Sequence, residues 1–121
     1  MGSIIANISG PASVENGGNR KVKKQTEESQ IKRSIRELLR WNKIFYYNAF
    51  GGPLSQKGIS DLICCYKGRF VAIEVKKKAG KLSPDQETFL QHVNESGGLG
   101  FVARSVEDVI HALGLKVNIS G

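Results

Sequence analysis

Two apolar segments joined by a tight turn decide the fold of this chain. They are Ser60-Asp61-Leu62-Ile63-Cys64-Cys65-Tyr66 and Arg69-Phe70-Val71-Ala72-Ile73-Glu74-Val75-Lys76, with Lys67-Gly68 between them. A Lys-Gly pair between two runs rich in strand-forming residues predicts a β-hairpin with a two-residue turn. In that register Ile63 faces Ala72, and Asp61 faces Glu74.

The polar residues at one end of this hairpin are the candidates for chemistry. Two carboxylates that face each other across a strand pair, Asp61 and Glu74, repel and destabilise the pair. Because side chains alternate between the faces of a strand, Lys76 shares the face of Glu74. The cluster therefore predicts a site for a divalent metal held by oxygen ligands. The alternative is a sheet end at which these carboxylates only form salt bridges with neighbouring lysines.

The apolar character of both hairpin faces predicts how the sheet is covered. A sheet that is apolar on both faces is typical of an α/β arrangement with helices on each side. Cys64 and Cys65 point to opposite faces, and we interpret both as small buried apolar residues. A strand over 99–104 follows a helix, so we expect it to pair in parallel with the second hairpin strand.

Local signals divide the rest of the chain. Residues 1–24 predict a flexible basic tail, residues 25–114 one compact domain, and residues 115–121 a C-terminal tail. The other expected elements are a helix from Glu27 capped by Thr26, a strand over 44–50, a loop over 51–58, a helix from Pro84 capped by Ser83, and a helix over 106–113 capped by Ser105.

Length and charge limit the function classes. The chain has 121 residues, and 18 Lys and Arg against 11 Asp and Glu give a net charge of +7. This excess favours a polyanionic partner, nucleic acid before membrane, although a solvated helix face would also carry many of these charges. No apolar run approaches the roughly 20 residues of a membrane span. The first residues lack the pattern of a signal peptide, so we expect a cytoplasmic protein without a membrane partner.

Three short motifs are similar to those of a known nuclease family. Gly58-Ile59-Ser60-Asp61-Leu62-Ile63, Glu74-Val75-Lys76 and Leu82-Ser83-Pro84-Asp85-Gln86 together resemble the VRR-NUC (virus-type replication–repair nuclease) branch of the PD-(D/E)xK superfamily. The resemblance extends from about Glu28 to Leu113. It implies a restriction-endonuclease-like α/β fold with an αβββαβ core, whose mixed sheet is covered by helices on both faces. Ser60 stands where the superfamily name has Pro, a position that tolerates change in this branch.

The resemblance also implies roles for the hairpin residues. Asp61 and Glu74 would be the metal-binding carboxylates, with the backbone carbonyl of Val75 as a further ligand, and Lys76 would be the catalytic lysine. The implied metal is Mg²⁺, and we expect Mn²⁺ to substitute for it. The implied activity is that of a structure-selective DNA endonuclease.

Two helix residues complete the implied catalytic set. Gln86 would point into the active site, although it also fits a capping box with Ser83. Glu28 would be the acidic residue of the first helix, with Glu27 as the alternative because helix registers are uncertain by a residue or two. An acid at this position is also favourable to the helix dipole without any catalytic role.

Basic residues near these motifs form the predicted DNA-contact surface, with the loop 51–58. They are Lys57, Lys77, Lys78, Lys81 and Arg104. Contacts with phosphates give affinity without reading a base sequence. For Arg104, simple solvation at a strand end is an equal alternative.

The resemblance implies that the expected substrate is branched DNA, in particular the Holliday junction, cut by a homodimer of bacterial, archaeal or phage origin. The strand Phe45 to Phe50 and the first helix are candidate dimer surfaces. The alternatives are a flap, nicking or restriction-like nuclease, an RNase, and a catalytically silent nucleic-acid-binding module.

Overall fold

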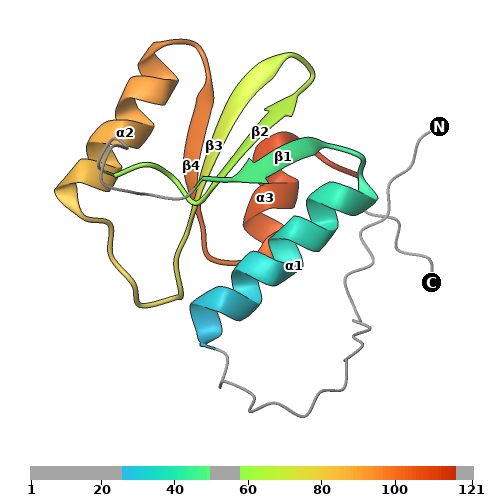
Figure 1. The fold of residues 1–121 in the computed structure, drawn as a ribbon, viewed down its shortest axis with the longest axis horizontal. Coiled ribbons are helices and arrows are strands. Elements are labelled where there is room, and N and C mark those ends of the chain that lie inside the picture. Colours follow the sequence, from blue (N-terminus) through green and yellow to red (C-terminus); the bar gives the residue numbers. More distant parts are fainter. Residues whose placement is uncertain (1–25, 50–57, 117–121) are drawn as a thin grey trace.

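The computed structural model describes residues 26–49 and 58–116 (Figure 1). The elements are helix α1 (Glu27–Trp41), strands β1 (Phe45–Asn48), β2 (Leu62–Tyr66) and β3 (Arg69–Val75), helix α2 (Pro84–Glu95), strand β4 (Leu99–Ala103) and helix α3 (Val106–Leu113). The predicted N-terminal tail, most of the predicted loop 51–58 and its Lys57 lie outside the described residues.

The four strands form one mixed sheet in the order β1-β2-β3-β4. The β1–β2 and β2–β3 pairs are antiparallel, whereas β3 and β4 pair in parallel as expected for two strands joined through a helix. This mixed sheet with its three helices confirms the predicted α/β, restriction-endonuclease-like core.

Helices cover both faces of the sheet (Figure 1). The apolar sides of α1 and α3 pack on one face, against a layer that includes Leu62 and Ile73. Leu90 and Val93 of α2 pack on the other face, against the centre of the β2–β3 hairpin. Because side chains alternate along a strand, Glu74 lies on the face that α2 covers.

The hairpin has the predicted register. Ile63 pairs with Ala72. The two turn residues, Lys67 and Gly68, have φ angles of 54° and 79°. A two-residue turn in which both central residues have positive φ has the twist of the flanking strands, and this fixes the register.

The position of Asp61 differs from the prediction. The β2–β3 ladder ends at the pair Leu62–Ile73, so Asp61 is not part of a cross-strand pair with Glu74. The chain bends at Asp61, and its Oδ2 accepts a hydrogen bond from the backbone N–H of Val75 at 2.9 Å. A carboxylate therefore takes the place of a backbone carbonyl at the end of the ladder.

Hydrogen-bonded caps start all three helices where the sequence predicts. The side chain of Thr26 accepts from the N–H of Ser29 in α1, and Ser105 caps α3 in the same way. Ser83 and Gln86 form a complete capping box at the start of α2. The strands are one or two residues shorter at their ends than predicted, since single backbone bonds replace the ladder there.

The interpretation of Cys65 as a buried residue is wrong. Cys64 is buried in the layer under α1 and α3, but Cys65 is exposed. Helix α2 covers the centre of its face and not the strand β1 or the hairpin end. Phe45, Tyr47 and Phe70 are therefore also exposed on that face, by 68%, 50% and 48%, and we refer to these three residues as the aromatic patch.

Within residues 26–49 and 58–116, no helix combines the length and the apolar character that a membrane span requires.

Candidate active site

Four polar side chains from three separate segments of the chain meet where β3 ends and α2 begins. We refer to these four residues as the acidic cluster. Asp61 comes from the bend before β2, Glu74 from β3, Lys76 from the residue after β3, and Gln86 from the first turn of α2. Gln86 Nε2 donates to Glu74 Oε2 at 3.0 Å, and Lys76 Nζ lies 3.8 Å from the same oxygen. The structure therefore brings together the four residues that the motifs identified.

Glu74 is the most unusual group of this cluster, because it is a carboxyl that is only 2% exposed. Its Oε2 accepts a hydrogen bond from Gln86 and lies beside Lys76, whereas its Oε1 is buried and accepts no hydrogen bond from the described residues. The pKa of Glu74 is raised to about 8, mainly by burial and next by the negative charge of Asp61, whose effect exceeds the lowering by the positive charge of Lys76. A buried carboxylate oxygen without a hydrogen-bond donor is costly, and a bound cation would satisfy it.

Asp61 has one oxygen held by the backbone and one that faces a lysine. Its Oδ2 accepts from the N–H of Val75, and its Oδ1 lies 3.2 Å from the Nζ of Lys32 on α1. In the sequence Lys32 is one of several basic residues of this helix, and its contact with Asp61 was not predicted. The available signal was its spacing of four residues from Glu28, which puts both on one helix face.

The structure favours Glu28 over Glu27 as the acidic residue of the first helix. Glu28 is partly buried and close enough that its charge contributes to raising the pKa of Glu74, whereas Glu27 is exposed. Buried Ile35 lies seven residues after Glu28, so one helix face runs from the core to the acidic cluster.

Gln86 is both a capping residue and a member of the cluster. Its Oε1 accepts from the backbone N–H of Ser83 at 2.9 Å, and its Nε2 donates to Glu74. Since the cap N–H requires an acceptor, the amide nitrogen must point to the carboxyl group. The capping box thus orients Gln86 and does not compete with a role in the site.

A basic loop follows Lys76, and Arg104 holds it. Lys77, Lys78 and Lys81 are exposed. A single guanidinium nitrogen of Arg104 donates to the carbonyls of Lys77 at 2.8 Å, Lys78 at 3.3 Å and Gly80 at 2.7 Å. These bonds favour a role for Arg104 in shaping the loop over the predicted direct contact with phosphate.

The donor set suits a hard cation with few protein ligands. In the part of the chain that the structure describes, no group of three or more His, Cys, Asp or Glu side chains is placed to hold a metal. Two oxygens of the carboxyl pair are not held by the backbone or by Gln86: Glu74 Oε1, and Asp61 Oδ1, which lies beside the ammonium of Lys32. Mg²⁺ keeps several waters and needs only one or two carboxylates, so these residues fit it.

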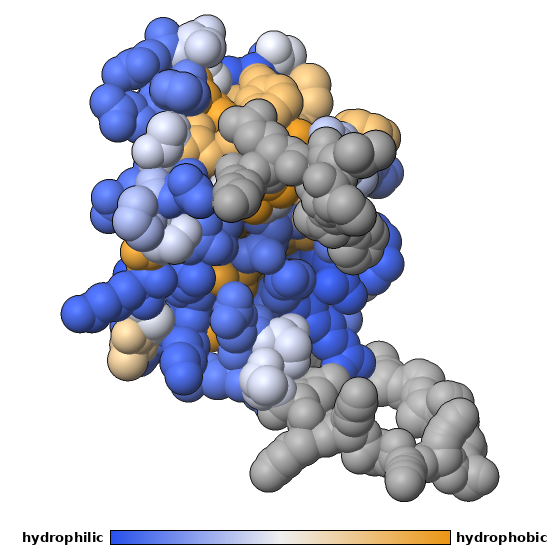
Figure 2. Space-filling view, turned by 60° about the vertical axis from the view of Figure 1, so that its left-hand side comes forward, coloured by the Kyte–Doolittle hydropathy of each residue, from blue (hydrophilic) through white to orange (hydrophobic). Residues whose placement is uncertain are grey.

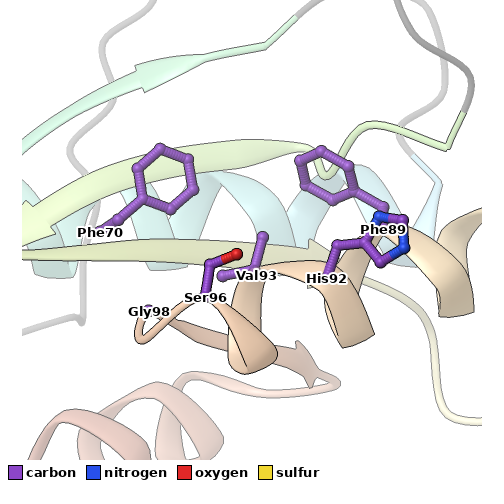
Figure 3. Close-up of a pocket in the computed structure, with 6 residues that line it drawn as sticks. All are labelled: Phe70, Phe89, His92, Val93, Ser96 and Gly98. Atoms are coloured by element: carbon purple, nitrogen blue, oxygen red, sulfur yellow. The ribbon is translucent and has the colours of Figure 1, made fainter.

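A separate apolar pocket of about 320 Å³ lies beside the later turns of α2 (Figure 3). Its walls are Phe70, Phe89, His92, Val93, Ser96 and Gly98. In Figure 3 the rings of Phe70 and Phe89 lie on either side of the Val93 side chain. No member of the acidic cluster lines this pocket, so it is distinct from the candidate active site.

Comparison with known families relates the chain to a nuclease family. The model of the family described as the VRR-NUC domain matches residues 19–107. The match covers α1, α2, all four strands and every residue of the acidic cluster. No curated protein and no solved structure matches the chain.

Proposed function

The chain belongs to the VRR-NUC family, which implies a nuclease-type function, and from this premise we propose that it is a Mg²⁺-dependent, structure-selective DNA endonuclease. The observation that supports this proposal best is the buried Glu74, whose Oε1 accepts no hydrogen bond from the part of the chain that the structure describes, although Asp61 lies beside it. Two adjacent carboxyl groups in this state cost stability when both are ionised, and a bound cation would offset that cost.

The residues around the cluster have separate tasks in phosphodiester hydrolysis. Asp61, Glu74 and the carbonyl of Val75 would hold the metal ion. When bound, Mg²⁺ supplies positive charge that offsets the charge developing on the phosphate. Gln86 holds Glu74 Oε2 and the N–H of Val75 holds Asp61 Oδ2, so both carboxyl groups are oriented before substrate arrives.

Lys76 is the residue that we assign to the attacking water. Its side chain is 17% exposed and its ammonium lies beside Glu74 Oε2, so it is accessible from the site and fixed in direction. An ammonium there can orient the water, take part in its deprotonation or neutralise the phosphate.

The exposed Lys77, Lys78 and Lys81 would contact the phosphates on either side of the scissile bond. Such contacts give affinity that falls steeply with salt and carry no sequence information. We therefore assign selectivity to the shape of the DNA.

We further propose that the enzyme works as a homodimer on branched DNA, with Holliday junctions as its substrate, because two active sites can cut two strands of a junction. The aromatic patch supports a second copy as partner, since large apolar side chains left exposed together on a domain mark interaction surfaces. Figure 2 shows apolar surface gathered in the upper part of a face that is otherwise largely hydrophilic.

Labelled four-way-junction DNA tests this function. The parent and Glu74→Gln proteins would be incubated with the junction and with linear duplex of the same sequence, in Mg²⁺, in Mn²⁺ and in chelator. We expect the parent to make paired nicks in the junction when metal is present. We expect no nicks in the linear duplex, in chelator or with Glu74→Gln. Parallel reactions with flap DNA and with RNA cover the alternative substrates, and cleavage of flap, duplex or RNA instead of the junction would replace the junction as substrate. Salt-sensitive binding without any cleavage would indicate the silent binding module.

A further inference from the structure

Lys32 contacts the acidic cluster, and the proposed mechanism gives this contact no role. Its Nζ lies 3.2 Å from Asp61 Oδ1, and the two side chains are 31% and 24% exposed. The residues are 29 positions apart and belong to different elements, so the packing of α1 on the sheet creates this pair. The basic helix α1 carries other Lys and Arg side chains, but among the described residues only Lys32 forms an ion pair with Asp61.

Hydrogen bonds distinguish the carboxyl oxygens of Asp61 and Glu74, because one oxygen of each residue is held by a donor of the protein scaffold. Asp61 Oδ2 is held by a backbone N–H, and Glu74 Oε2 is held by Gln86. The other two oxygens are the ones left for a cation, and the ammonium of Lys32 already lies on one of them. Lys76, by contrast, lies beside Glu74 Oε2, which the protein itself already holds.

We propose that Lys32 is an internal counter-ion of Asp61 that competes with the divalent metal for Asp61 Oδ1, so that metal loading displaces its ammonium. This inference rests on the proposed function, because it concerns the metal of the same site. The flexible stem of a lysine allows the ammonium to move while buried Ile35, three residues later, keeps the helix in place.

In this mechanism the displaced ammonium of Lys32 pairs with a phosphate of the substrate. Lys32 stays at the edge of the cluster, where a phosphate of the substrate can pair with it. A phosphate that binds Lys32 removes the competitor of the metal, so metal and DNA binding strengthen each other. The contact thus keeps the DNA-free protein weakly loaded and makes substrate favour loading.

Mn²⁺ binding to the DNA-free protein tests the competition without relying on cleavage. Isothermal titration calorimetry, with electron paramagnetic resonance of free Mn²⁺ as a second measurement, would compare the parent with Lys32→Met and Lys32→Arg. Arg33→Gln is the matched control, because it removes one positive charge from an exposed neighbouring position of α1. Circular dichroism would show that each variant is folded.

We expect Lys32→Met to bind Mn²⁺ on the order of tenfold more tightly than the parent, as one unit charge is removed from the side of a metal ligand. Arg33→Gln should change the affinity less than about twofold, and Lys32→Arg should stay near the parent. Unchanged or weaker Mn²⁺ binding by Lys32→Met would overturn the competition, and so would a lack of Mn²⁺ binding in parent and variant alike. If Lys32→Met binds Mn²⁺ more tightly than the parent but the parent cuts no DNA, the nuclease assignment fails and the role of Lys32 stands.

Discussion

Replacing Glu74 by Gln should change how the stability of the metal-free protein depends on pH. Burial, with the charge of Asp61 next in importance, raises the pKa of Glu74 from 4.5 to about 8. The folded protein therefore binds this proton more tightly than the unfolded chain does. Between pH 4.5 and 8 the folded state holds more protons, so its stability falls as the pH rises through this window.

The size of the effect follows from the shift. One pKa unit corresponds to about 1.4 kcal/mol, so the shift of Glu74 corresponds to a loss of about 5 kcal/mol between pH 4.5 and pH values above 8. Glu74 is only 2% exposed, so solvent screens little of this cost. A loss of this size is a large part of the roughly 5–15 kcal/mol that stabilises a typical domain. Glutamine resembles the protonated carboxyl and carries no charge, so Glu74→Gln should lose most of this dependence.

Urea unfolding in chelator at pH 5.5 and pH 9 measures the effect. The parent should lose several kcal/mol of unfolding free energy between these values, and Glu74→Gln should lose much less. Glu87→Gln, on the exposed side of α2, is the matched control and should follow the parent. Equal pH dependence in the parent and Glu74→Gln would show that Glu74 ionises readily in the folded protein, and the burial argument would be refuted.

Four other predictions concern the site and its supports. As the pH rises toward 8, Mn²⁺ binding to the parent should strengthen about tenfold per pH unit and then level off, because a proton must leave Glu74 before the metal binds. Calorimetry that shows no such dependence of affinity on pH would contradict this. Lys76→Met should abolish cleavage but reduce junction binding only a few fold in gel-shift assays, whereas equal loss of both would make Lys76 a binding residue. Arg104→Ala should leave three carbonyls of the basic loop without their donor and should speed amide hydrogen exchange over 77–81. Unchanged exchange there would show that the loop keeps its conformation without Arg104. Gly58→Ala should destabilise the domain by about 1–3 kcal/mol in thermal unfolding, because φ of Gly58 is 78° and a Cβ would overlap the backbone carbonyl of Asp85. Gly97→Ala is the control and should destabilise the domain less, because Gly97 also has a positive φ but open space around the Cβ position.

The sequence by itself determined the elements of this protein and identified the four residues of the acidic cluster. The Lys-Gly turn set the hairpin register, and the Ser and Thr caps set the starts of the helices, because these signals act between residues that are close in the chain. The spacing of Asp61, Glu74, Lys76 and Gln86 matched a family motif, so these residues could be predicted together without any knowledge of distances.

Only the tertiary structure decided which groups occupy each oxygen of the acidic pair and which residues support them. It placed Asp61 in a bend outside the ladder, Lys32 on Asp61, and Arg104 under the basic loop. It also left Cys65 exposed, because α2 covers only part of its face. A lysine on a basic helix has the same local pattern whether it faces solvent or a carboxylate. The difference depends on how separate elements pack, and packing is a property of the whole fold rather than of neighbouring residues.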